Sequence, residues 1–348
     1  MNGELGGGVV VGVSAGEEGL YRERLLRLAA EWHPLPDKPE ETPEASLAAL
    51  WHAAAGRACS VRQACRRHLP ALDTAALTRL DDLIRQRLAG VPLAHLIGWQ
   101  EFMGIELMVS ADALIPRAET ELLGRAALSC LEEIASINGT AKVIDVCTGS
   151  GNLALTLARY VACANVWAAD LSPEAVTLAK RNAELLGLGE RVRFCVGDLL
   201  APMDTEEFHG AVDLLVCNPP YISSGKVDTM PTEIVGYEPR LAFDGGPLGI
   251  RILQRLIGEA PRYLRVGGWL AFEVGLGQAR GVRRRMESQG AFGEIREIAD
   301  AGGALKTFAT EYASAGTGSG HIMGTCRMGN DPRVSVIDRW CRSHEVPN

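Results

Sequence analysis

Between residues 142 and 299 the sequence alternates short apolar runs with amphipathic segments, and this alternation narrows the possible folds more than any other feature. Apolar runs of strand length occupy residues 142–147, 165–170, 191–196, 212–217, 268–274 and 293–299. Segments with a helical period occupy residues 152–162, 173–187, 247–264 and 277–288. Strands that alternate with helices form a mainly parallel sheet with helices on both faces. We therefore expect an α/β fold with a doubly wound sheet.

The tetrapeptide at residues 218–221, Asn-Pro-Pro-Tyr, directly follows the fourth apolar run. Open α/β sheets bind their ligands at the carboxyl ends of strands, where this tetrapeptide is expected to lie. The Asn218 side chain and the Pro219 carbonyl give it two acceptors, on a loop that the rings of Pro219 and Pro220 stiffen. Two fixed acceptors suit the two hydrogens of an –NH2 group, and Tyr221 adds a flat face for a planar group. A rigid turn without a chemical role is the alternative, because Pro-Pro often makes one.

The turn at residues 145–152, Asp-Val-Cys-Thr-Gly-Ser-Gly-Asn, connects the first apolar run to a helix. Its glycines let a ligand approach the backbone, and the amino terminus of the helix offers unpaired N–H groups. The Gly-x-Gly spacing alone would also fit a dinucleotide. Asp145 argues against a dinucleotide, because a carboxylate so close repels phosphates and tolerates a ligand with a positive sulfonium.

Acidic residues also follow the next two predicted strands. Asp170 lies about twenty residues after the glycine turn, where a carboxylate can accept both hydroxyls of a ribose. A cap for the following helix is an equally good role for Asp170 taken alone. Asp198 is in place to meet an adenine amino group. Together the three strand ends outline a site for S-adenosylmethionine. The residues expected to contact this methyl donor are Asp145, Cys147, Thr148, Gly149, Ser150, Gly151, Asp170, Asp198, Leu199 and Asn218.

Composition limits the partners and the compartment. The chain has 348 residues, 47% of them hydrophobic, and a formal net charge of −8. This charge creates no global attraction to nucleic acid or to an anionic membrane, so neither is expected as a direct partner. The nine cysteines show no CxxC pair and no Cys/His zinc spacing, so no metal is expected and a reducing, cytoplasmic location is favoured. Seven arginines between residues 57 and 87 form either solvated helix faces or a docking surface for an acidic partner.

The strand-end acids and the Asn-Pro-Pro-Tyr loop resemble those of class I S-adenosylmethionine-dependent methyltransferases that act on amide or base –NH2 groups. Further segments resemble the HemK-type (PrmC-like) protein-glutamine methyltransferases over about residues 43–303. These segments are residues 87–92 (Arg-x-x-Gly-x-Pro), 98–102 (Gly-x-x-x-Phe), 116–121 (Pro-Arg-x-x-Thr-Glu), 237–246 and 267–275. The resemblance implies a Rossmann-like class I fold with a small N-terminal helical domain. It also implies methylation of the glutamine in the Gly-Gly-Gln loop of class I peptide chain release factors.

The resemblance further implies direct methyl transfer by in-line displacement, with Asn218 and Pro219 as the catalytic residues. Their two acceptors would hold the amide hydrogens and aim the nitrogen lone pair at the methyl group. No general base is expected, because an N-protonated amide is strongly acidic. Tyr221, Pro220 and Phe102 would surround the glutamine side chain and exclude water. A structural salt bridge or a loop hydrogen bond is the preferred role for Arg117, Thr120, Glu121 and Glu238.

Breaks in the pattern divide the chain into five parts. They are an N-terminal extension and linker (1–42), a helical substrate-docking domain (43–90), a β-hairpin connector (91–117), the methyltransferase domain (118–303) and a tail (304–348). Within the tail, about residues 320–348 resemble a fragment of the glucose–methanol–choline oxidoreductases, and His321 matches a histidine of their active site. Only about thirty residues match and no second Gly-rich unit exists, so no flavin is expected. The tail is interpreted as a fusion remnant, an artefact or a segment packed on the surface.

Other activities stay open at this point. A related acceptor is a ribosomal-protein glutamine, although residues 116–121 resemble the release-factor enzymes more closely. Another is the amino group of a nucleic-acid base, which an enzyme would have to flip out of a duplex. The acidic net charge counts against a nucleic-acid substrate. Flavin-dependent oxidation by the tail is the least favoured activity.

Overall fold

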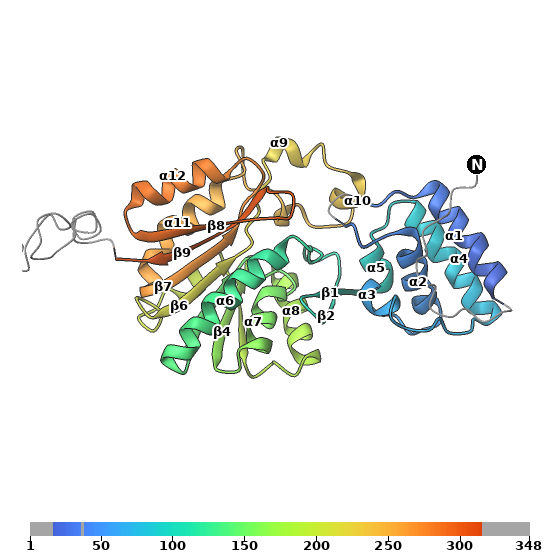
Figure 1. Ribbon diagram of the computed structural model, residues 1–348, viewed down its shortest axis with the longest axis horizontal. Coiled ribbons are helices and arrows are strands. Elements are labelled where there is room, and N and C mark those ends of the chain that lie inside the picture. The colour runs from blue at the N-terminus through green and yellow to red at the C-terminus, as the bar shows by residue number, and fades with distance from the viewer. Residues whose placement is uncertain (1–16, 36–37, 315–348) are drawn as a thin grey trace, which may run out of the picture.

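The computed structural model describes residues 17–35 and 38–314, and Figure 1 shows a helical bundle beside a larger α/β domain. The bundle contains α1 (Glu18–Glu31), α2 (Pro43–Ala54), α3 (Val61–Ala64), α4 (Thr74–Leu88) and α5 (Leu93–Ile97). An antiparallel hairpin of β1 (Trp99–Phe102) and β2 (Ile105–Met108) follows the bundle and leads into the α/β domain. The small N-terminal helical domain that the sequence predicts is therefore present.

Side-chain caps and one apolar core build the bundle. Asp73 begins α4 by accepting a hydrogen bond from the Ala76 backbone at 2.6 Å, which satisfies an N–H that the first turn leaves unpaired. Trp51 is fully buried, and its indole N–H donates to the Pro70 carbonyl at 2.8 Å. Tyr21 of α1 packs against Trp51 with ring centroids 5.8 Å apart. Helix α1, in the segment expected to be an extension, thus contributes to the core of the bundle.

In the part of the chain that the structure describes, seven strands form the sheet of the α/β domain, in the order β5-β4-β3-β6-β7-β9-β8. They are β3 (Ala141–Val146), β4 (Ala164–Asp170), β5 (Val192–Val196), β6 (Val212–Cys217), β7 (Leu264–Glu273), β8 (Phe292–Ala299) and β9 (Leu305–Tyr312). Strands β3 to β7 pair in parallel, and β9 runs antiparallel to both of its neighbours. The predicted doubly wound, mainly parallel sheet is confirmed.

Helices cover both faces of this sheet (Figure 1). One face carries α6 (Thr120–Asn138), α7 (Asn152–Tyr160) and α8 (Pro173–Leu185), and the other carries α11 (Arg251–Tyr263) and α12 (Ala279–Gln289). Successive strand residues point to opposite faces. Accordingly, Val143 of β3 packs in a cluster with Leu123 of α6, whereas Ile144 packs in a second cluster with Leu256 of α11.

Strand β9 consists of residues that the sequence analysis assigned to the tail. It lies between β7 and β8, where Phe308 is fully buried and stacks on Phe272 of β7 at a centroid distance of 5.7 Å. The domain boundary expected after residue 303 is therefore wrong. Residues 307–310 are all buried, because a strand inside a sheet is covered on both faces, so its sequence lacks the alternation that reveals a half-buried strand. His321 and the resemblance around it lie outside the described residues.

A buried ion network joins the bundle to the long loop that follows β6. Arg87 of α4 is fully buried, and its guanidinium donates to Glu41 at 2.5 Å and to Glu233 at 2.9 Å. Glu233 belongs to α10 (Thr232–Val235) of that loop and also accepts from Lys38 at 3.1 Å. The Arg87 guanidinium carbon lies 3.5 Å from the centroid of the Trp32 ring. The bundle thus contacts the same loop that begins with Asn-Pro-Pro-Tyr.

Two features are not found among the described residues, a membrane-spanning helix and a group of metal ligands. Between residues 17 and 314, apart from the undescribed pair 36–37, no helix is long and apolar enough to cross a membrane. Over the same residues, no group of three His, Cys, Asp or Glu side chains is arranged to hold a metal ion.

Candidate active site

A cavity opens at the carboxyl ends of β3, β4, β5 and β6. It contains about 1040 Å³ of space free of protein atoms, part of it open to solvent, which is enough for a ligand of nucleoside size. Eight of the residues expected to contact the methyl donor line it: Cys147, Thr148, Gly149, Ser150, Asp170, Asp198, Leu199 and Asn218. We call this space the donor cavity. Asp145 and Gly151, the other two, do not line it.

Asp145 lies beneath the donor cavity at the end of β3 and is completely buried. Its Oδ2 accepts hydrogen bonds from the Thr148 hydroxyl at 2.6 Å and from the Ala154 backbone at 3.1 Å. Its Oδ1 has no partner, and neither does the hydroxyl of Ser150 above it in the turn. Burial raises the pKa of Asp145 to about 7, against the lowering effect of its two hydrogen bonds. An unpaired carboxylate oxygen beside a cavity is a feature that a cationic ligand would satisfy.

The turn between β3 and α7 needs unusual backbone angles. Gly149 and Gly151 have φ angles of +55° and +85°, in the left-handed region that favours glycine. Cys147 has a φ of +59° although it is not glycine, which is uncommon and typical of backbone held in place at a ligand site. Gly151 immediately precedes α7 as its N-cap. Both predicted glycines therefore shape the turn. Gly149 lines the donor cavity, and Gly151 does not.

Asp170, at the end of β4, holds two backbone segments together. Its Oδ2 accepts from the Gly149 backbone at 2.8 Å and its Oδ1 from the Ser172 backbone at 3.0 Å. The cap of the next helix is Ser172, whose hydroxyl accepts from Ala175 at 3.1 Å, so helix capping by Asp170 is not what the structure contains. Burial raises the pKa of Asp170. Its neighbour Leu171 also lines the donor cavity and is 52% exposed.

Asp198 lines the donor cavity but already has a strong partner. Both of its oxygens accept from the Arg255 guanidinium, at 3.0 and 2.9 Å, and its side chain is 50% exposed. Arg255 lies on α11, far along the chain, and no sequence pattern predicted this ion pair. Leu199 follows with a φ of +49° and is 5% exposed. An adenine amino group at Asp198 would therefore share the carboxylate with Arg255.

Asn218 stands between the donor cavity and a second, smaller cavity, and lines both. The second cavity contains about 510 Å³ of free space, and we call it the acceptor cavity. Asn218 Nδ2 donates to the Thr120 hydroxyl at 3.1 Å. Among the described residues, nothing donates a hydrogen bond to Asn218 Oδ1 or to the Pro219 carbonyl. Pro219 and Tyr221 line the acceptor cavity, and Pro220 lines the donor cavity.

Residues from two other segments contact the backbone of the Asn-Pro-Pro-Tyr loop. Gln278, which precedes α12, donates through Nε2 to the Tyr221 carbonyl at 2.7 Å. Gly245 packs so closely that a Cβ atom there would lie 2.6 Å from the Pro220 carbonyl oxygen. A separation below 3.0 Å between these atoms requires the backbone to move. Glycine at position 245 is therefore needed for the approach of residues 245–249 to the Asn-Pro-Pro-Tyr loop.

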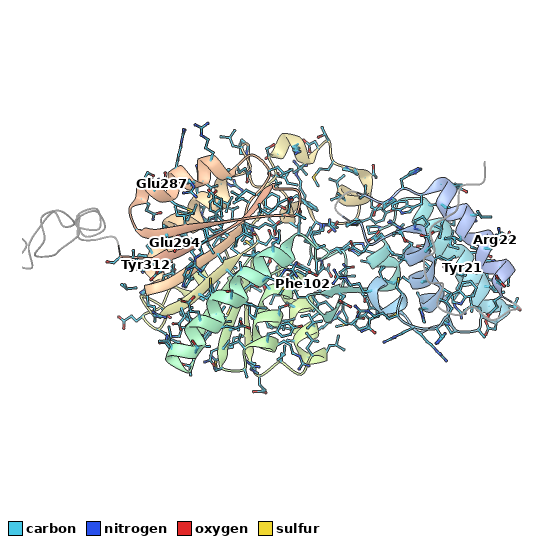
Figure 2. The ribbon with its side chains drawn as sticks, in the orientation of Figure 1. Tyr21, Arg22, Phe102, Glu287, Glu294 and Tyr312 are labelled. Atoms are coloured by element: carbon cyan, nitrogen blue, oxygen red, sulfur yellow. The ribbon has the colours of Figure 1, made fainter. Side chains whose placement is uncertain are left out.

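Phe102, expected to wall the glutamine side chain, is not part of either cavity. It is 1% exposed and belongs to the apolar core that also contains Leu123 and Leu153. Figure 2 labels it where the hairpin adjoins the α/β domain. The apolar side chains at the acceptor cavity come instead from loops on either side: Leu114, Ile222, Met230, Ile234 and Phe243. Loop residues of this kind carry no periodic signal, so the sequence did not identify them.

Other motif residues have structural partners. Arg117 donates to Glu238 at 2.6 Å in a buried ion pair, and Glu238 also accepts from the Ile115 backbone at 2.8 Å. Glu121 accepts from the Met103 backbone at 3.2 Å. These contacts match the structural roles preferred for Arg117, Glu121 and Glu238. They fix the segment before α6 against the loop after β6.

A family model described as a methyltransferase domain matches residues 137–274. The release factor glutamine methyltransferase of Moorella thermoacetica is 40% identical over 237 residues, which cover 68% of this chain and 81% of that protein. The chain belongs to the release factor glutamine methyltransferase family. A second member of this family, from Gloeobacter violaceus, is 35% identical over 238 residues, covering 68% of this chain and 80% of that protein. A solved ribosomal protein L11 methylase from Lactobacillus delbrueckii subsp. bulgaricus is 22% identical with a TM-score of 0.41, covering 58% of this chain and 82% of that one.

A second family model, described as GMC oxidoreductase, matches residues 255–348. This range begins well before the segment in which the sequence analysis noted the resemblance. Its described part contains β7, α12, β8 and β9 and most of α11. All of these elements belong to the methyltransferase sheet or cover it. The described residues of this match, 255–314, are therefore part of the α/β methyltransferase domain.

Proposed function

We propose that this chain transfers the methyl group of S-adenosylmethionine to the side-chain amide nitrogen of a glutamine in a peptide chain release factor. One observation carries the proposal: Asn218 lies between two cavities, and its Oδ1 and the Pro219 carbonyl are unengaged among the described residues. Relatives that are 40% and 35% identical to this chain over 237 and 238 residues carry the name of this reaction. Both arguments favour an amide nitrogen as the group that is methylated.

The donor cavity suits S-adenosylmethionine in size and in chemistry. The methyl donor supplies an activated methyl group on a positively charged sulfur. We expect the unpaired Oδ1 of Asp145 and the hydroxyl of Ser150 to interact with its cationic amino-acid part. Asp170 retains free lone pairs for ribose hydroxyls beyond its two backbone bonds. Asp198 is the expected partner of the adenine amino group, with Arg255 as its second partner.

We expect the acceptor cavity to take an extended glutamine side chain, beside the charged residues Arg117, Glu119 and Glu273 that also line it. An amide nitrogen is a weak nucleophile because its lone pair is delocalised into the carbonyl. Hydrogen bonds from its two N–H groups to Asn218 Oδ1 and to the Pro219 carbonyl favour a pyramidal nitrogen and direct its lone pair toward the donor cavity. Tyr221 and the apolar loop residues around it would exclude water from the glutamine. The proton leaves after methyl transfer without a dedicated base, since the N-protonated amide is strongly acidic.

The direct test mixes the purified chain, S-adenosylmethionine and a class I release factor, and locates the modification by mass spectrometry. The expected result is a mass increase of one methyl group on the peptide that contains Gly-Gly-Gln. Parallel reactions contain ribosomal protein or DNA in place of the release factor. An unmodified Gly-Gly-Gln peptide, together with methylated ribosomal protein or DNA, would contradict the proposal.

A further inference from the structure

The orientation of the Asn218 amide decides whether the proposed reaction can occur. The oxygen and nitrogen of an asparagine amide exchange places on a 180° rotation, which converts an acceptor into a donor. The proposed function requires Oδ1 to face the glutamine, because the glutamine –NH2 group offers only donors. Some feature of the surroundings must therefore distinguish the two ends of the Asn218 amide, and its neighbours across α6 and β7 provide one.

Thr120 is the immediate neighbour of the Asn218 amide. It is the first residue of α6, is 1% exposed, and accepts the hydrogen bond from Asn218 Nδ2 at 3.1 Å. A threonine hydroxyl carries a single hydrogen, which can be donated in one direction only. If that hydrogen points away from Asn218, the threonine oxygen can only accept from Asn218. The –NH2 end then faces Thr120 and Oδ1 faces away from it.

Glu273 is the neighbouring acceptor to which we assign the hydrogen of the Thr120 hydroxyl. It is the last residue of β7, is 1% exposed, and its Oε2 has no hydrogen-bond partner among the described residues. The Thr120 hydroxyl lowers the pKa of this carboxyl as a neighbouring hydrogen-bond donor. An ionised carboxylate accepts hydrogen bonds and donates none. Glu273 Oε1 also accepts from the Tyr221 hydroxyl at 2.8 Å. With its hydrogen directed to the unpaired Glu273 Oε2, the Thr120 hydroxyl would accept from Asn218 and donate to Glu273.

Further charged groups surround Glu273. Glu119 lies beside it, with Oε1 3.4 Å from the Tyr221 hydroxyl and Oε2 2.5 Å from Lys306 Nζ of β9. The pKa of Glu273 is raised to about 7, chiefly by burial and also by Glu119, while Tyr221, Thr120 and Lys306 act to lower it. A protonated Glu273 could donate to Thr120, whose own hydrogen could then turn toward Asn218. The preference for one amide orientation would be lost.

We propose that Thr120 and Glu273 are positioning residues that fix the orientation of the Asn218 amide and keep its Oδ1 available to the methyl acceptor. This inference rests on the proposed function and adds two residues that would act through Asn218, Thr120 at the donor cavity and Glu273 at the acceptor cavity. Tyr221 takes part from the other side, since its hydroxyl holds the Glu273 carboxylate. The ion pair between Glu119 and Lys306 connects this group of side chains to β9.

The first test compares Thr120→Val with Thr120→Ser. Valine keeps the shape and removes the acceptor, so kcat for glutamine methylation is expected to fall by about 10- to 100-fold, with the Kd for S-adenosylmethionine changed by less than about two-fold. Serine restores a hydroxyl, so kcat is expected to return to within about three-fold of the wild type. Thr310→Val is the matched control, because Thr310 is also fully buried and hydrogen-bonded, to the Glu294 carbonyl at 2.8 Å, on β9. Equal losses in Thr120→Val and Thr120→Ser, or a Thr120→Val kcat within about two-fold of the wild type, would overturn the inference.

The second test is independent of whether Thr120→Val folds. At saturating S-adenosylmethionine, kcat of the wild type is expected to fall as the pH drops below about 7, because Glu273 becomes protonated. Glu273→Gln cannot titrate, so its kcat is expected to be lower at pH 8 and to lack that acidic limb. An acidic limb of equal position and depth in both proteins would overturn the role of Glu273. A wild type that leaves the release factor unmodified would instead refute the proposed function, so the two failures are distinguishable.

Discussion

At the scale of single residues, Asp145 shows how a buried carboxyl can make the binding of a cationic ligand depend on pH. Its carboxyl lies beneath the donor cavity, fully buried and with one oxygen unpaired. Burial raises its pKa to about 7, so the proton is retained over much of the acidic range. A positively charged ligand above it would favour the ionised form and lower this pKa again. Binding of such a ligand therefore requires the carboxyl to lose its proton.

This linkage predicts that S-adenosylmethionine binds more tightly as pH rises. Below a pH of about 7 the affinity is expected to increase by up to about ten-fold per pH unit, and above it the affinity levels off. Asp145→Asn carries no proton to lose, so its affinity is expected to be weaker at pH 8 and nearly independent of pH. Isothermal titration at pH 6, 7 and 8 measures both proteins. The same pH slope in Asp145→Asn as in the wild type would show that another group is responsible.

Gly245 gives a second prediction at this scale. Its missing Cβ would lie 2.6 Å from the Pro220 carbonyl oxygen, so Gly245→Ala is expected to lower the free energy of unfolding by about 1–3 kcal/mol. Gly258→Ala is the control, since a Cβ there meets nothing within 4 Å and the residue lies inside helix α11. That control is expected to be neutral or to stabilise by about 0.5–1 kcal/mol. Urea denaturation measures both, and equal effects would argue against the close approach.

At the scale of secondary-structure elements, β9 carries the clearest consequence. It pairs with both β7 and β8 and buries Phe308 in the apolar cluster beneath α11 and α12. Figure 2 labels Tyr312 near its end. Without β9, the facing edges of β7 and β8 would lose their hydrogen-bond partners, and unpaired buried backbone groups are costly. The strand also supplies Lys306 to the cluster around Glu273.

Truncation tests the role of β9. A chain that ends after residue 303 is expected to be unfolded or to melt far below a chain that ends after residue 314, which retains the whole of β9. Within the full chain, Phe308→Ala is expected to cost about 3–5 kcal/mol of unfolding free energy. Circular dichroism melting measures all three. A cooperative, wild-type-like transition in the chain ending at residue 303 would contradict the assignment.

The sequence predicted those parts of the site that lie at regular places in the fold. Asp145 and Asp170 lie near the ends of apolar runs and Asn218 follows one, and the carboxyl ends of parallel strands meet at one edge of the sheet. The fold class followed from the same alternation. Partners from distant segments could not be predicted in this way. Arg255 reaches Asp198 from a helix 57 residues away, and Phe102 faces the core because its strand turns that side inward.

At the scale of the whole molecule, the ion network around Arg87 connects the helical bundle to the loop of the acceptor cavity. Arg87 is fully buried between Glu41 and Glu233. Ile234, the residue after Glu233, lines the acceptor cavity. The position of the bundle and the shape of this cavity are therefore linked through one short helix, α10.

Removal of the buried guanidinium tests this connection. Arg87→Met leaves two buried carboxyl groups with only Lys38 nearby, and it is expected to lower the free energy of unfolding by about 3–5 kcal/mol. Arg262→Met is the control, because Arg262 pairs with Asp204 on the surface, where an ion pair contributes about 0–1 kcal/mol. Urea denaturation of the two variants gives the comparison. Similar losses in both would mean that the buried network adds no more than a surface ion pair.

The central claim is that Asn218 acts on the methyl acceptor and not on the methyl donor. The most direct measurement compares Asn218→Ala with the wild type in two assays, the Kd for S-adenosylmethionine by isothermal titration and the rate of release-factor methylation by mass spectrometry. Asn165→Ala, an exposed position on β4, is the matched control and is expected to behave as the wild type. For Asn218→Ala we predict that methylation falls by at least about 100-fold while the Kd changes by less than about three-fold. A Kd that weakens in step with the rate, or a rate that persists, would contradict the account.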